Sequence, residues 1–133
     1  MKDYILREIE KVTDIIAALA GLKTPGKEDE FIQLADRALL NGYNISLSGL
    51  LELDEEDFKS WLEKGIYKAD KLDALAQLLY LYCLPFSKSP ESQCSLEKIL
   101  SIFNLLETKY HWQSFENIDK RNSIRQFLNN NNE

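Results

Sequence analysis

The stretch Leu72–Phe86, LDALAQLLYLYCLPF, is the most apolar part of the chain and constrains the fold more than any other feature. After Gln77 it leaves no polar face on a helix, and a helix that is apolar all round is buried in a protein core or in lipid. A membrane-spanning helix needs about 20 apolar residues, but this run is shorter and stops before Pro85. The stretch therefore predicts a central helix that neighbouring helices cover on several sides.

Five other segments repeat apolar residues at the spacing of an amphipathic helix. Capping residues sharpen their ends: Ser95 and Ser114 are expected to begin helices, and Gly65 is expected to end one. Residues 43–53 are ambiguous, and residues 85–94 have the Pro- and Ser-rich composition of a loop. Together with the central run, the predicted helices cover residues 3–20, 28–41, 54–65, 70–84, 95–110 and 114–127.

These elements predict an all-α fold of about six helices in one domain over residues 1–133, with a frayed tail at 128–133. The scarcity of turn residues, 5 Gly and 3 Pro, argues against an all-β fold. Because the connectors are short, neighbouring helices are expected to pack as antiparallel hairpins in a stack or an irregular bundle.

The net charge of −6 excludes some partners. Residues 1–66 carry all of this excess, and residues 67–133 are balanced. No segment has enough Lys and Arg to neutralise a row of phosphates, so nucleic-acid binding, including a helix-turn-helix DNA binder, is disfavoured. Five charges interrupt the apolar residues at the N-terminus, which a signal peptide would not tolerate, so we expect a cytoplasmic protein with no membrane span: Arg7, Glu8, Glu10, Lys11 and Asp14.

Two features of the sequence are candidates for metal binding or catalysis. The run Glu52–Asp57 holds five carboxylates, but Phe58 and Trp61 fall where a calcium loop needs oxygen ligands. It is therefore interpreted as an acid-rich helix start, with a partner-facing acidic patch as the alternative. His111 is the only histidine, and no nucleophile or phosphate-binding motif accompanies it, so we expect no enzyme, cofactor or metal. Two cysteines, Cys83 and Cys94, are expected to be reduced thiols.

The first predicted helix carries a heptad-like apolar seam: Ile5, Ile9, Val12, Ile16 and Leu19. This seam either packs into its own domain or joins two copies as a homodimer, and the sequence leaves both readings open. Three aromatic residues, Tyr80, Tyr82 and Trp61, are candidate contacts for a protein partner or a ligand. A small-ligand pocket near Tyr80 and Tyr82 is the alternative to ordinary packing of these rings.

Three segments resemble a small, uncharacterised bacterial family of tetratricopeptide-like helical proteins: DYILREIEKVTDIIAALAGL, FIQLADRALLNGYNISLSGLLELDEEDF and KADKLDALAQLLYLY. The resemblance covers roughly residues 3–82. It implies a right-handed solenoid of helical hairpins without catalytic residues, although the 34-residue repeat of strict tetratricopeptides is not visible. The expected function is a non-catalytic interaction or scaffold domain with an unidentified protein partner. A small-ligand-binding regulator is the alternative.

Overall fold

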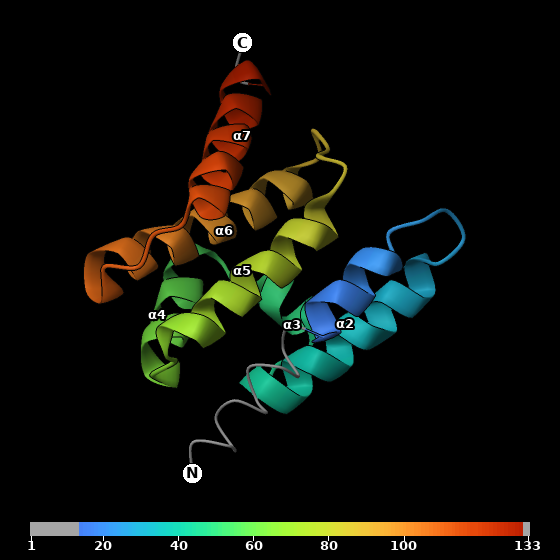
Figure 1. The fold of residues 1–133 in the computed structure, drawn as a ribbon, viewed down its shortest axis with the longest axis horizontal. Coiled ribbons are helices and arrows are strands. Elements are labelled where there is room, and N and C mark those ends of the chain that lie inside the picture. Colours follow the sequence, from blue (N-terminus) through green and yellow to red (C-terminus); the bar gives the residue numbers. More distant parts are fainter. Residues whose placement is uncertain (1–13, 132–133) are drawn as a thin grey trace. The chain divides into compact units, whose positions relative to one another are not determined.

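The structure, a computed structural model, describes residues 14–131, and these are almost entirely helical. Figure 1 shows a helical segment over residues 14–21 followed by six helices: α2 (Glu28–Tyr43), α3 (Leu47–Glu52), α4 (Glu55–Gly65), α5 (Ala69–Cys83), α6 (Pro90–Tyr110) and α7 (Phe115–Asn131). No strand occurs between residues 14 and 131, so the predicted all-α class is confirmed. None of the helices in this range is long and apolar enough to cross a membrane.

The chain divides into two compact units, residues 1–54 and residues 55–133. Within the described part of the first unit, α2 is tied to α3 by one side chain. The carboxylate of Asp36 on α2 accepts a hydrogen bond from the backbone N–H of Leu47, the first residue of α3, at 2.7 Å. Ser46 caps the same helix by accepting from the N–H of Gly49 at 3.0 Å. The segment that was ambiguous in the sequence is therefore a short capped helix.

In the second unit, α5 is the buried centre that the apolar run predicts. Leu79 is fully buried, and buried residues lie on several sides of the helix: Leu72, Ala74, Leu75, Ala76, Leu78, Leu79 and Cys83. Figure 1 shows α5 and α6 side by side as a helical hairpin. The sequence favours Asp70 as the cap of this helix, but the helix begins at Ala69 after Lys68, so Asp70 lies in its first turn.

The start of α6 differs from the prediction. The helix begins at Pro90 and not at Ser95, because the hydroxyl of Ser89 caps it by accepting from the N–H of Ser92 at 3.2 Å. Proline suits the first helical position, where its missing N–H is not needed. Ser95 is buried inside the helix, and its hydroxyl donates to the carbonyl of Glu91. Half of the loop expected at residues 85–94 is thus helical.

A polar network joins α7 to α5. Gln77 Nε2 donates to Asp73 at 3.2 Å and to the side-chain oxygen of Asn117 at 2.9 Å. Asn117 Nδ2 donates to Asp73 at 2.8 Å, and Lys120 donates to Gln77. Further along, Phe127 meets Phe86 with ring centroids 5.3 Å apart. The start of α7 therefore lies beside the first half of α5, and its later part contacts the segment that follows α5.

Helix α7 is also longer than the sequence predicts. Ser114 caps the helix as expected, by accepting from the N–H of Asn117 at 3.1 Å. The helix then continues to Asn131, into the segment that was expected to fray.

Candidate interaction surface

The connections that follow α4 and α6 approach each other at one end of the second unit. The α4–α5 and α6–α7 connections are held together there, because the hydroxyl of Tyr110 donates to the backbone carbonyl of Tyr67 at 2.5 Å. The start of α7 lies beside the first half of α5, since Asn117 contacts Asp73. We call the exposed and half-exposed apolar residues of these connections the end surface: Ile66, Tyr67, Tyr110, Trp112 and Phe115.

An aromatic row along α4 leads from the core to this surface. Phe58 is buried and stacks on Trp61, with ring centroids 5.9 Å apart. Trp61 is half-buried, and its ring lies 5.5 Å from that of Tyr67 in a tilted arrangement. Such aromatic pairs stabilise their relative positions beyond simple burial. Packing against Trp61 therefore holds the ring of Tyr67, and the hydrogen bond from Tyr110 holds its backbone carbonyl.

Ile66 has an unusual backbone conformation. Its φ of 50° lies in the left-handed region, which a β-branched residue rarely adopts. The preceding Gly65 is required because a Cβ there would lie 2.1 Å from the ring of Tyr67. Ile66 thus takes the position after a helix where glycine or asparagine is usual, yet its side chain is 80% exposed and has little packing to stabilise it.

The α6–α7 connection exposes two more large rings. His111 ends α6 in the left-handed conformation, and the N–H of Trp112 bonds back to the carbonyl of Leu106 at 2.9 Å. This turn leaves Trp112 39% exposed and Phe115, the first residue of α7, 89% exposed. Phe115 lies on the face of α7 opposite the buried residues Asn117 and Ile124.

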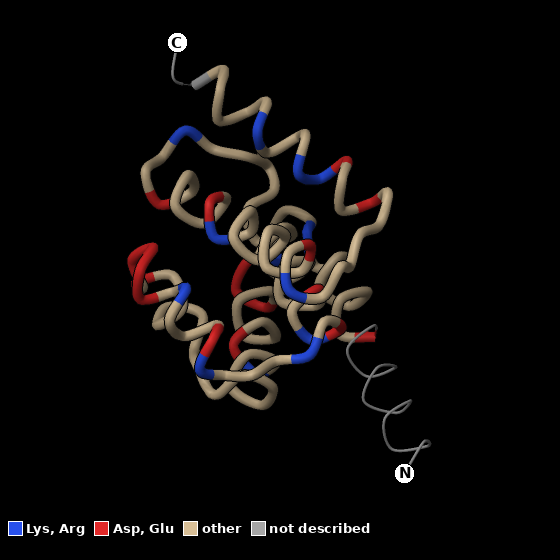
Figure 2. Tube along the Cα trace, turned by 90° about the vertical axis from the view of Figure 1, so that its left-hand side faces the viewer, with Lys and Arg blue, Asp and Glu red and all other residues tan. Residues whose placement is uncertain are grey.

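Charges of both signs border the end surface. The lysines are Lys64 in the last turn of α4, Lys68 at the start of α5, Lys71 with its ammonium 5.7 Å from the Tyr67 ring, and Lys109 with its ammonium 5.5 Å from the Tyr110 ring. The acids are Glu63, Asp70 and Glu116, in the adjoining helix turns. Figure 2 shows Lys and Arg interspersed among Asp and Glu along the described part of the chain.

The aromatic residues singled out in the sequence lie in two places. Trp61 belongs to the row beneath the end surface. Tyr80 lies elsewhere, with its ring 5.7 Å from Phe86 and 5.3 Å from the ammonium of Lys120. Tyr80 and Tyr82 are both half-buried, and burial raises the pKa of each phenol above its usual value. The structure therefore does not bring these three rings together.

The predicted N-terminal seam falls partly outside the described residues. Ile5, Ile9 and Val12 lie there. Of the remaining two, Ile16 is half-buried and Leu19 is fully buried.

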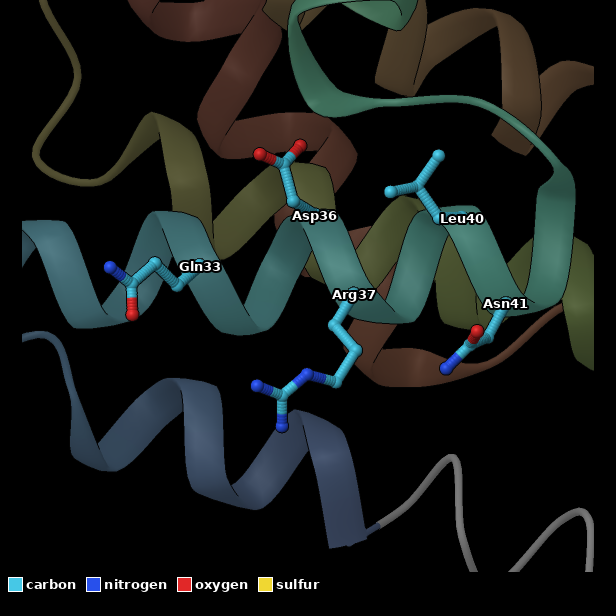
Figure 3. Close-up of a pocket in the computed structure, with 5 residues that line it drawn as sticks. All are labelled: Gln33, Asp36, Arg37, Leu40 and Asn41. Carbon is cyan, nitrogen blue, oxygen red and sulfur yellow. The ribbon is translucent and has the colours of Figure 1, made fainter.

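A hollow of about 430 Å³ lies on α2 (Figure 3). Its five lining residues all come from this one helix, and all except Asp36 are exposed: Gln33, Asp36, Arg37, Leu40 and Asn41. Figure 3 shows Asp36 and Arg37 pointing to different sides of the helix. The carboxylate of Asp36 is already used to hold the start of α3, so the hollow lacks the convergent polar groups of a ligand site.

Metal-binding groups do not converge in the described part of the chain: no set of three or more His, Cys, Asp or Glu residues between residues 14 and 131 could hold an ion. The two cysteines are free thiols, Cys83 buried and Cys94 exposed. His111 is an exposed turn residue.

Sequence patterns only partly signalled the end surface. The pair Gly65–Ile66 places an apolar residue directly after a helix stop, and the HWQSF segment places Trp112 and Phe115 on either side of the cap Ser114. Apolar residues at helix ends that lie outside the periodic pattern are the signal that could have identified them. The α4–α5 and α6–α7 connections that carry these residues are joined by the Tyr110–Tyr67 hydrogen bond, between residues 43 positions apart.

Comparison with known proteins adds no relative: no protein-family model, no curated protein and no solved structure matches the chain.

Proposed function

We propose that the chain is a non-catalytic protein-interaction domain that docks through the end surface of its second unit. One observation carries this proposal. Among the described residues, three of the four exposed large hydrophobic side chains belong to this surface, namely Ile66, Trp112 and Phe115, while the fourth, Leu40, lies on α2. Exposed large apolar side chains are found at interaction sites, and aromatic side chains are enriched at the centres of protein interfaces.

The conformation of Ile66 supports the same function. A left-handed conformation costs a residue with a branched side chain about 1–2 kcal/mol, and the exposed side chain recovers little of this within the chain. Asn would end α4 at lower cost, since its side chain tolerates this conformation. An apolar side chain that is strained and exposed at once is expected where a partner covers it.

The finer architecture belongs to the same proposal. We propose that the helices stack as hairpins, as in the tetratricopeptide-like proteins that the sequence resembles, and that the domain acts in the cytoplasm. The α5–α6 hairpin supports this arrangement. A small-ligand site beside Tyr80 and Tyr82 has less support, because Tyr80 already contacts Phe86 and Lys120.

The test compares captured proteins between matched surface variants. Immobilised wild-type protein, Phe115→Ser, Ile66→Asn and the control Leu40→Ser are each incubated with lysate of the native cell, and bound proteins are quantified by mass spectrometry. We expect a partner that wild type and Leu40→Ser retain and that both end-surface variants lose. Ile66→Asn should also raise the free energy of unfolding by about 1 kcal/mol, so that its loss of binding is not a loss of folding. Equal retention by all four proteins would refute the proposal.

A further inference from the structure

One face of α7 carries nearly all of its contacts with the rest of the second unit. Most of the covered side chains recur at spacings of three and four, so they form one stripe along the helix. The first half of this stripe is mostly polar, and the second half is apolar. Among residues 115–130, whose burial the structure describes, the buried and half-buried side chains are Asn117, Ile118, Lys120, Arg121, Ile124, Phe127 and Leu128.

Two cations of this stripe cover aromatic rings of α5 and α6. The ammonium of Lys120 lies 5.3 Å from the ring of Tyr80 on α5. The guanidinium of Arg121 lies 5.9 Å from the ring of Phe103 on α6. Both cations regain their hydration when they leave these rings, so contacts of this kind stabilise a partly exposed helix only weakly.

The apolar half of the stripe is short. Ile124 is fully buried, and the ring of Phe127 lies 5.3 Å from that of Phe86, in the segment after α5. By contrast, α5 and α6 each bury seven side chains, most of them apolar, and they form a hairpin with each other (Figure 1). Helix α7 therefore has much less buried apolar surface to lose than its neighbours have.

The connection before α7 provides a hinge. The end of α6 is closed by the N–H of Trp112, which donates to the carbonyl of Leu106 at 2.9 Å. Helix α7 starts at its cap, Ser114. Gln113 stands between these two structures and belongs to neither helix. Rotation about its backbone can therefore move α7 as a rigid rod without disturbing the end of α6.

We propose that α7 is a hinged cover. It undocks as one helix about Gln113 while the rest of the second unit stays folded, and it uncovers the rings of Tyr80, Phe86 and Phe103. The chain then has two forms that differ in exposed aromatic surface, and the docked form keeps more of this surface covered. This inference does not depend on the docking function proposed for the end surface.

Native-state hydrogen exchange of the full-length wild type, at increasing urea below the unfolding transition, measures this opening. We expect the α7 amides between Ile118 and Phe127 to share one opening free energy that is lower, and less dependent on urea, than that of the α5 amides. Equal opening free energies in α7 and α5 overturn the inference, because α7 would then open only by global unfolding. Protection that falls off residue by residue along α7 also overturns it, because the helix would fray and not undock as one.

Phe127→Ala separates undocking from fraying, with the exposed neighbour Gln126→Ala as the control. Loss of the ring contact with Phe86 weakens only the docked form. The amides near Asn117, roughly 15 Å away along the helix, should therefore exchange about tenfold faster. The α5 amides should be unchanged, and the control should match wild type throughout. Faster exchange confined to the last turns around Phe127 contradicts undocking as one helix.

Ile124→Glu is designed to hold α7 undocked, because it places an unpaired carboxylate at a fully buried position. The exposed neighbour Ser123→Glu is the matched control. We expect Ile124→Glu to lose amide protection in α7, to keep it in α5, and to bind more of a neutral dye that fluoresces on exposed apolar surface than wild type or the control does. Loss of protection in α5 as well overturns the inference, since the rest of the unit should stay folded without α7. Undocking with no gain in dye fluorescence overturns the uncovering of the rings.

Discussion

Helices α5 and α7 both belong to the second unit but are held in different ways. α5 buries seven of its 15 residues, six of them Leu or Ala. α7 is longer, at 17 residues, yet among its residues 115–130, whose burial the structure describes, only Asn117 and Ile124 are buried. Apolar burial therefore stabilises α5, whereas hydrogen bonds from Asn117 and Lys120 and the ring contact of Phe127 seat α7.

The difference matters for the end surface. Phe115 is the first residue of α7, so its position depends on the polar network two residues further along, at Asn117. A helix with little apolar burial opens locally at a lower free energy than the core of the unit. We therefore expect the two halves of the end surface to differ in rigidity: Tyr67 is anchored to the core through Trp61, and Phe115 through hydrogen bonds.

The largest effect is expected from Leu79→Ala on α5. Leu79 is fully buried, so the truncation should leave a cavity and lower the free energy of unfolding by about 2–5 kcal/mol. Urea denaturation followed by circular dichroism measures it. Leu40→Ala, which truncates a 52% exposed leucine, is the matched control and should cost less than about 0.5 kcal/mol. Equal costs in the two variants would mean that α5 is not the core.

Asn117→Ala is expected to have an intermediate effect, confined to α7. It removes the bonds to Gln77 and Asp73 and leaves these polar groups with fewer partners, at a cost of about 1–3 kcal/mol. Hydrogen exchange should show faster exchange of the α7 amides with little change in α5. Asn122→Ala, an exposed asparagine on the same helix, is the control and should leave exchange in both helices unchanged. Faster exchange in α5 as well would show that the two helices open as one.

The same contrast explains what the sequence could predict. The run Leu72–Leu84 identified the buried helix because apolar burial leaves a pattern in the residues themselves. The attachment of α7 to α5 leaves no such pattern in the sequence. Asn117 is polar, and its hydrogen-bond partners Gln77 and Asp73 lie about 40 positions away. The start of α6 was misplaced because Pro90 was interpreted as a loop residue, although proline also favours the first position of a helix.

The candidate site was less predictable than the fold. The sequence analysis named Trp61 as a candidate contact, and Trp61 packs against Tyr67 beneath the end surface. Its other candidates, the N-terminal seam and the Tyr80–Tyr82 pair, are not part of the end surface. Ile66 and Phe115 could not be placed from their own sequence neighbourhood, because exposure of an apolar residue depends on which elements fail to cover it. Which elements cover these residues depends on the Tyr110–Tyr67 hydrogen bond and on the position of α7, and both are tertiary features.

The smallest effect concerns the second polar attachment of α7, the ion pair of Arg121 with Glu107 on α6, whose nearest atoms lie 2.5 Å apart. The hydrogen bond from Arg121 holds the pKa of Glu107 below its ordinary value of 4.5. A carboxyl group with a lowered pKa in the folded state stabilises the fold fully above its unfolded pKa. This stabilisation falls as the pH drops through the folded pKa, because both states are then protonated.

Arg121→Gln should therefore lower stability by about 0.2–1 kcal/mol near neutral pH, as expected for a partly exposed pair. The difference from wild type should shrink as the pH falls below the ordinary Glu107 value of 4.5. Melting temperatures of both proteins across this range measure it.

Arg121→Lys is the matched control: it keeps the charge and should retain part of the pH dependence, although it loses the planar hydrogen-bonding group. A wild-type–Gln difference that stays constant down to strongly acidic pH would show that Arg121 acts through its contact with the Phe103 ring, at 5.9 Å, and not through Glu107. In that case an aromatic contact would attach α7 to α6, and the helix would depend less on polar groups than its contacts with α5 indicate.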